Sequence, residues 1–303
     1  MTIINDDENL MRKIQPAEFP GLLMNIPKEE MPESLWMRGV RPPMDYKYVC
    51  IVGSRAPSPY GKEVCRMLLE GLRGLPIVIV SGLAIGIDSL AHKCALEFGL
   101  KTIAFPGSGL NHNILYPKHS LRLAEDILDA GGALFSEFSP ERRAEPYMFP
   151  QRNRLMAGTS HLSIVIEAKE KSGSLITTKF ATNYFRDVGA VPGSVFSHLS
   201  AGPHLLLSVC ANPIRNSGDI IALLGLDTYI SETEKFKYSD DVEEYEDLSP
   251  DELLIIKSAK LTSKKDEIIR DSTLSPSRAS VAISLLLIKE ILTEEEGNLF
   301  LKK

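Results

Sequence analysis

The feature that most constrains the fold is a regular alternation of short apolar runs and helical stretches that begins at Tyr48. The apolar runs are rich in Val, Ile and Leu and lack the polar alternation of half-exposed strands. Strands of that kind, separated by helices, are buried on both faces and pair in parallel. The pattern predicts an α/β fold with a doubly wound parallel sheet, whose strands are expected near residues 48–54, 77–82, 101–107, 133–138, 162–168 and 188–193.

Charge and composition divide the chain further. The proline-rich residues 1–44 are interpreted as an N-terminal extension that lies on the α/β domain and is anchored by Leu35 and Trp36. The α/β domain itself, residues 45–226, has a net charge of +3, which leaves a polyanionic partner open. Residues 227–248 are acidic and poor in aliphatic side chains, so they are expected to form a solvated linker.

A second small domain is predicted over residues 249–303. Ser249 is an expected N-cap, with Pro250 at the first helical position and Glu252 completing a capping box. Two further helical stretches and two short strands follow, which describes a winged helix-turn-helix. The third helix is mainly apolar, so contact with another protein and contact with DNA both remain open.

Composition excludes several classes of protein. The acidic N-terminus does not resemble a secretory signal, and no apolar run is long enough to span a membrane. The four cysteines form no C-x-x-C pair, which argues against structural zinc and a disulfide framework. A cytoplasmic protein without membrane partners is therefore expected.

Small residues and cations gather after the predicted strands. After the first strand comes Gly53-Ser54-Arg55, where a glycine permits close backbone approach and a guanidinium can clamp a phosphate. Arg152 and Arg154 open a helix whose positive N-terminus favours anions. The carboxyl ends of parallel strands lie at one edge of the sheet, so these clusters predict one anion site there. Its candidate residues are Gly53, Ser54, Arg55, Gly82, Arg152, Asn153, Arg154, Ser172, Gly173, Ser174 and Lys179.

Four further polar residues allow two interpretations. Asp88 and His92 lie four residues apart on one helix face and could form a metal site or an acid/base pair. Glu137 and Glu167 follow neighbouring strands and could form a hydrolase pair. The structural interpretation is favoured for both pairs, as helix caps and loop contacts.

No cofactor motif is present. The turn at residues 172–174 lacks the G-K-[ST] of a P-loop, and no G-x-G-x-x-G occurs, which disfavours ATP and nicotinamide cofactors. His112 and His119 have a spacing that fits no standard zinc site. The sequence thus predicts neither a metal nor a cofactor.

The motifs taken in order resemble the DNA-processing protein A (DprA/Smf) family. They are G-S-R, S-G-L-A-x-G-I-D-x-x-A-H, the Tyr116-Pro117 loop, L-F-S-E, F-P-x-R-N-R, S-G-S-L-I-T and A-V-P-G, within roughly residues 46 to 225. The resemblance implies a non-catalytic, Rossmann-like protein that binds single-stranded DNA, forms a dimer and loads the RecA recombinase during natural transformation. It also implies that Arg55, Arg152 and Arg154 contact the DNA.

The chain departs from the family pattern at three positions, His119, His204 and Cys210, which affects the expected geometry of the pocket. Two alternative functions remain: a nucleotide phosphoribohydrolase-like enzyme and a nucleotide sensor. The string Pro106-Gly107-Ser108-Gly109-Leu110 only partly matches the P-G-G-x-G-T-x-x-E signature of such enzymes and lacks its glutamate, which disfavours the first alternative.

Overall fold

The computed structural model describes residues 11–209, 211–227, 248–259, 262–272, 274–289, 291–295 and 297–301. The chain divides into two compact units, Met1–Tyr229 and Ile230–Lys303. Nearly all of the expected acidic linker and the departure at Cys210 lie outside the described residues. The two units are therefore taken one at a time.

The first unit is built on a nine-stranded sheet in the order β1-β2-β6-β5-β4-β3-β7-β8-β9. From β6 through β9 every neighbouring pair is parallel, whereas β1 and β2 are antiparallel additions at one edge. The strands are β1 Met11–Ile14, β2 Leu35–Gly39, β3 Lys47–Val52, β4 Ile77–Ser81, β5 Lys101–Ala104, β6 Ala133–Ser136, β7 Leu162–Val165, β8 Asp187–Ala190 and β9 Asn212–Pro213.

The predicted doubly wound parallel sheet is confirmed. Every residue of β4 is buried, as are all residues of β3 after Lys47, so these central strands are covered on both faces. The chain passes from β3 through β4 and β5 to β6 on one side and then returns to β7 beside β3. This reversal between β3 and β7 is the topological switch point of the sheet.

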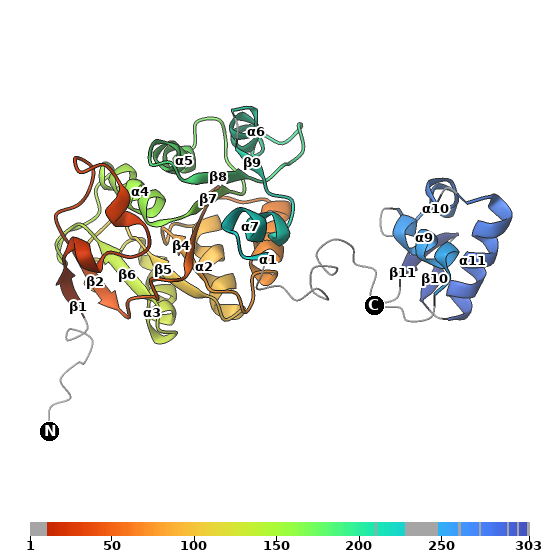
Figure 1. Cartoon of the computed structure of the whole chain (residues 1–303), viewed down its shortest axis with the longest axis horizontal. Coiled ribbons are helices and arrows are strands. Elements are labelled where there is room, and N and C mark those ends of the chain that lie inside the picture. The colour runs from red at the N-terminus through yellow and green to blue at the C-terminus, as the bar shows by residue number, and fades with distance from the viewer. Residues whose placement is uncertain are drawn as a thin grey trace, which may run out of the picture. The chain divides into compact units, whose positions relative to one another are not determined.

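Helices cover both faces of the sheet (Figure 1). On one face α7 packs against α1, α1 against α2, and α2 against α3. On the other face α4 and α5 pack together. Short 3₁₀ helices are η2 Pro16–Glu18, η3 Leu23–Asn25 and η4 Lys118–Ser120. The α-helices are α1 Pro59–Glu70, α2 Ile87–Glu97, α3 Leu121–Asp129, α4 Met148–Thr159, α5 Ser174–Asn183, α6 Ala201–Ser208 and α7 Ser217–Leu224.

The N-terminal region differs from the expected draped extension. β2 pairs with β6, and β1 pairs with β2, so this region continues the sheet. Leu35 is fully buried, as predicted, but Trp36 is only partly buried. Arg38 also donates to both oxygens of Glu125 on α3, at 3.0 and 2.9 Å. The sequence did not reveal these strands because each is short, with four and five residues, and prolines lie close to both.

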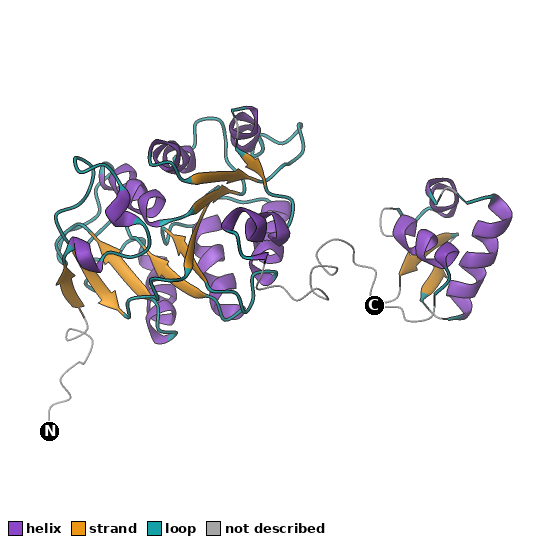
Figure 2. Cartoon of the chain, in the orientation of Figure 1, coloured by secondary structure: helices purple, strands orange, loops and turns teal. Residues whose placement is uncertain are grey.

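In its described residues, the second unit contains the helices α9, α10 and α11 and an antiparallel sheet of two strands (Figure 2). The predicted capping box is present, because Ser249 N donates to Glu252 Oε2 at 2.7 Å and Glu252 N donates to Ser249 Oγ at 3.4 Å. The winged-helix identity of the unit stays a prediction. Its elements are α9 Pro250–Ala259, α10 Lys265–Asp271, α11 Pro276–Ile288, β10 Leu292–Glu295 and β11 Asn298–Leu301.

Within the described parts of the chain, no helix combines the length and the apolar character needed to cross a membrane.

The burial of β2 predicts that it is an integral part of the sheet. Leu35→Ala removes a fully buried side chain from the core and should lower the free energy of unfolding by about 2–5 kcal/mol in urea titrations. Val40→Ala, at a position 57% exposed just after β2, is the matched control and should change it by less than about 0.5 kcal/mol. Equal, small effects of the two substitutions would mean that β2 is only loosely attached.

Candidate nucleic-acid interface

A cavity of about 430 Å³ lies at the switch point of the sheet. In open α/β sheets, ligands bind outside the carboxyl ends of the strands at this point. Five of the predicted anion-site residues do not line this switch-point cavity: Ser54, Gly82, Arg154, Ser172 and Lys179. Six of them do line it: Gly53, Arg55, Arg152, Asn153, Gly173 and Ser174.

Arg55 is the exposed cation of the switch-point cavity. It follows β3, and its loop is held against the start of α2, where Ile87 N donates to Ser54 O at 3.1 Å. Gly86 has a φ of 88°, and a Cβ on it would lie 2.2 Å from Ser54 O, so only glycine fits this contact. In the described part of the chain, Arg55 has no carboxylate at ion-pair distance, so its guanidinium is available to a phosphate.

Two aromatic residues that the sequence analysis did not select stand beside this cation. The guanidinium carbon of Arg55 lies 6.0 Å from the centre of the Phe149 ring. Tyr116 is 48% exposed, and its ring centre lies 5.7 Å from that of Phe149 at an interplanar angle of 57°. Tyr116 is exposed and Phe149 is partly buried, and a cation beside accessible aromatic rings is the combination that binds a nucleotide by phosphate contact and base stacking. The available signal was that both residues lie in motifs already noted, Tyr116 in the Tyr116-Pro117 loop and Phe149 as the first residue of F-P-x-R-N-R.

Arg152 lies in the wall of the cavity and is almost completely buried. Its Nη1 donates to the carbonyl oxygen of Gly82 at 2.5 Å and to that of Phe105. Its Nε donates to Asn153 Oδ1 at 3.2 Å. The structure thus gives this guanidinium internal partners, where the sequence analysis expected a phosphate contact. Burial lowers the pKa of Arg152, and the nearby Asp88 carboxylate acts in the opposite direction.

The start of α5 forms the facing wall. Asn153 Nδ2 donates to Gly173 O at 3.3 Å, which links α4 to this turn. Ser172 Oγ and Ser174 Oγ are 2.7 Å apart and share a hydrogen bond. The turn is therefore ordered by its own contacts, and its small side chains leave room for a ligand backbone.

The two remaining predicted cations lie elsewhere. Arg154 Nη2 donates to both carboxylate oxygens of Glu137 at 2.7 Å, and only 13% of the Arg154 side chain is exposed. Glu137 thus has the structural contact that was favoured for it. Lys179 is exposed on α5 but does not line the cavity.

Glu167 also makes structural contacts. It is 3% exposed and accepts from Ser58 N at 2.9 Å and from Ser58 Oγ at 2.5 Å. Ser58 is the N-cap of α1, and its hydroxyl accepts from Gly61 N at 3.1 Å. Glu167 therefore holds the start of α1 in place.

Asp88 and His92 are both buried on the inner face of α2. His92 Nδ1 lies 2.7 Å from Thr102 Oγ1, which packs the ring against β5. Burial raises the pKa of the Asp88 carboxyl to about 6, although Arg152 and backbone N–H groups oppose the shift. Burial lowers the pKa of His92 to about 3, and the positive charge of Arg152 adds to this effect.

The residues that the structure describes contain no grouping of His, Cys, Asp or Glu that could hold a metal ion. Cys50, Cys65 and Cys94 are buried and unpaired by disulfides.

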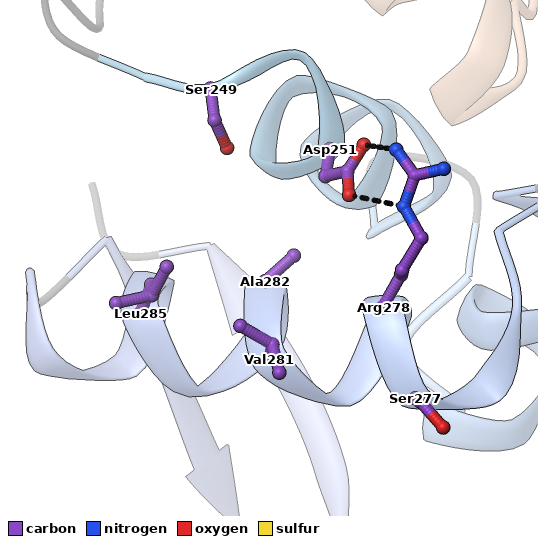
Figure 3. Close-up of a pocket in the computed structure, with 7 residues that line it drawn as sticks. All are labelled: Ser249, Asp251, Ser277, Arg278, Val281, Ala282 and Leu285. Carbon is purple, nitrogen blue, oxygen red and sulfur yellow. Dashed lines mark hydrogen bonds and ion pairs between the residues drawn. The ribbon is translucent and has the colours of Figure 1, made fainter.

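A separate pocket lies within the second unit, between α9 and α11 (Figure 3). Arg278 faces Asp251 across it and donates to both carboxylate oxygens, at 2.8 and 2.6 Å. Val281 and Leu285 line the pocket and are exposed. This pocket thus presents apolar side chains and a cation that already has an acidic partner.

Comparisons with known proteins identify a family and several relatives with similar sequences or structures. The family model for "DNA recombination-mediator protein A" matches residues 11–225. The DNA processing protein DprA of Streptococcus pneumoniae is 40% identical over 193 residues, which cover 64% of this chain and 67% of that protein. Protein Smf of Escherichia coli is 40% identical over 178 residues, which cover 59% and 47%. Against Smf, this chain therefore spans about half of the relative's length.

Two solved structures are also similar. The X-ray structure of DprA from Streptococcus pneumoniae superimposes with a TM-score of 0.64 and 36% identity, over 72% of this chain and 75% of that one. The DNA processing protein A of Helicobacter pylori, described for its single-stranded DNA binding mode, has a TM-score of 0.62 and 27% identity, over 72% and 96%.

The opposite pKa shifts of Asp88 and His92 predict opposite effects of pH on stability. Between about pH 4 and pH 6 the folded protein binds more protons at Asp88 than the unfolded chain, so the contribution of Asp88 is lost as the pH rises. Between about pH 3 and pH 6.5 the folded protein binds fewer protons at His92 than the unfolded chain does, so the contribution of His92 to stability is lost as the pH falls. Each effect should approach about 1.4 kcal/mol per pH unit.

Urea unfolding at several pH values separates the two effects. Relative to the unsubstituted protein, Asp88→Asn should gain stability as the pH rises from about 4 to 6. His92→Gln should instead gain relative stability as the pH falls from about 6.5. A constant difference across the whole range would contradict the burial of the titrating group concerned.

Proposed function

This chain belongs to the DNA recombination-mediator protein A family, and from that membership we propose that its switch-point cavity binds single-stranded DNA. The observation that carries the proposal is the exposed, unpaired guanidinium of Arg55 beside the rings of Phe149 and Tyr116. A guanidinium binds phosphate, and an aromatic face stacks on any base. Binding should therefore be independent of sequence and should weaken as salt increases.

The buried residues of the site hold the cavity wall in place. Arg152 holds Gly82, Phe105 and Asn153 by hydrogen bonds and so fixes the cavity wall. The cavity volume of about 430 Å³ is suited to a ligand of nucleotide size. Phosphate contacts position a strand, while stacking adds affinity without base recognition.

The biological role we propose is that of a recombination mediator. From the family resemblance we propose, more specifically, a cytoplasmic homodimer that protects incoming DNA and loads RecA on that DNA during natural transformation. The test is RecA filament formation on single-stranded DNA covered by a single-strand-binding protein. Addition of this chain should shorten the lag before filaments form, and an unchanged lag would remove the loading step from the proposal.

We propose a binding protein rather than an enzyme. Two observations support this: Glu137 is paired with Arg154, and Glu167 is bonded to the N-cap of α1, so neither carboxylate is placed as half of a hydrolytic pair. Incubation with nucleoside monophosphates tests the alternatives. Release of free base would indicate the phosphoribohydrolase-like enzyme, and saturable binding of the nucleotide by a protein that does not bind single-stranded DNA would indicate a nucleotide sensor in the same cavity.

Arg55→Ala should weaken binding to single-stranded DNA and reduce its salt dependence. Loss of one phosphate contact lowers the slope of log affinity against log salt by roughly 0.7 on a single strand. Fluorescence anisotropy with an unstructured oligonucleotide over a range of salt measures both quantities. Arg215→Ala, at an exposed arginine beyond β9 that is paired with Asp219, is the control and should leave the slope unchanged.

The stability of each variant decides how its result is interpreted. Arg55→Ala should keep the melting temperature, because the side chain is exposed, whereas Arg152→Ala should lower it together with affinity. An Arg55→Ala protein with the unsubstituted slope would place the DNA outside the switch-point cavity.

Truncation tests where the main site lies. A chain that ends at residue 226 should keep most of the affinity for single-stranded DNA, because Arg278 is paired and α11 exposes Val281, Leu285 and Ile288. Residues 227–252 have a net charge of −9, so their removal should slightly strengthen binding at low salt, with an effect that fades as screening increases. A large loss of affinity would instead move the main site to the second unit.

A further inference from the structure

A second, smaller cavity of about 230 Å³ lies on the other side of the turn at residues 84–86. Ala84 lines the switch-point cavity, whereas Ile85 and Gly86 line the second one. The backbone of Gly86 also packs directly against Ser54 and Arg55, since a Cβ there would lie 2.2 Å from Ser54 O and 2.7 Å from Arg55 Cα. The two cavities therefore share this turn as a common wall.

The second cavity presents cationic and hydrogen-bonding side chains without an acidic one. Lys93 on α2 and His119 in η4 are exposed, and both line it. In the described part of the chain, Lys93 has no carboxylate at ion-pair distance. The hydroxyls of Ser89 and Ser120 donate to the carbonyls of Ala84 and Leu83, so they order the wall. Lys93 and His119 are therefore the groups offered to a ligand.

The geometry of α2 gives the distance from the shared turn at residues 84–86 to Lys93. Ser89 and Lys93 are four residues apart on the outer face of α2, while Asp88 and His92 face inward. Lys93 comes seven residues after Gly86, which corresponds to about 10 Å along the helix. About three nucleotides of a stacked strand cover that distance at 3.4 Å each.

We infer that single-stranded DNA leaves the switch-point cavity over the turn at residues 84–86, and that Lys93 and His119 bind its next phosphates. Ile85 is 52% exposed at the top of this turn, where its apolar side chain contacts the sugar or base of the crossing nucleotide. The inference rests on the proposed function of the switch-point cavity. It adds a direction for the strand and a minimum length for full binding.

Two oligothymidylates of different length test this path. One of about two nucleotides occupies the switch-point cavity but is too short to cover the roughly 10 Å to Lys93, and one of about 16 nucleotides reaches both cavities. Lys93→Ala should leave the affinity for the short strand unchanged and weaken binding of the long one. For the long strand the magnitude of the salt slope should fall by roughly 0.7, so the affinity advantage of the unsubstituted protein over Lys93→Ala shrinks about 2.6-fold between 50 and 200 mM salt.

Matched variants make the result specific. Lys101→Ala removes an exposed lysine at the amino end of β5, the opposite edge of the sheet, and should change neither strand's affinity. Lys93→Arg keeps the charge and should keep the slope for the long strand. His119→Ala should weaken the long strand alone. Each variant's melting temperature is measured beside its affinity, and all should match the unsubstituted protein because the positions are exposed.

The outcomes separate this inference from the proposed function. Suppose that Lys93→Ala, like Lys101→Ala, does not change the affinity for the long strand, while Arg55→Ala weakens binding of both strands. The switch-point cavity is then supported as the DNA site, and the path over the turn at residues 84–86 is wrong. If Lys93→Ala weakens the short and long strands equally, Lys93 belongs to the first phosphate contact and the path is also wrong. If Arg55→Ala changes neither strand, the proposed function itself fails.

Discussion

The buried guanidinium of Arg152 is the interaction on which the site depends. It donates to the carbonyl oxygens of Gly82 and Phe105, the residues that directly follow β4 and β5. A buried cation is costly unless hydrogen bonds and an opposite charge compensate it, and Asp88 supplies that charge. Gly82 accommodates it closely, since a Cβ there would lie 2.2 Å from Arg152 Nη1. One side chain of α4 thereby sets the spacing of two strand ends.

This arrangement distinguishes the charged residues that make contacts within the protein from Arg55, which is accessible at the cavity. Arg152 and Arg154 are engaged within the protein, and Glu137 and Glu167 hold helices in place. Arg55 is exposed and has no acidic partner among the residues that the structure describes, so it remains accessible at the cavity wall. A preorganised site of this kind binds a flexible polyanion without first rearranging, so little affinity is lost to ordering the protein.

The sequence predicted the features that depend on the spacing of apolar residues and on local capping chemistry. Apolar strands between helices identified the parallel sheet, and Ser249 with Glu252 identified a capping box that the structure contains. The orientation of Arg152 could not be derived, because residue type alone does not say which face of α4 points inward. The aromatic pair Tyr116 and Phe149 comes from segments far apart in the chain, and β1 and β2 are recognisable only by their pairing partners.

The pairing of β2 with β6 also affects how the chain is made. Trp36 pairs with Ser136, so β2 is synthesised 100 residues before its partner strand exists. At about 5–20 residues per second, a ribosome needs about 5–20 s to reach that partner. During this interval the apolar side chains of Leu35 and Met37, which are buried in the finished fold, have no sheet to cover them. The strand that begins the domain is thus among the last to acquire its partner in the sheet.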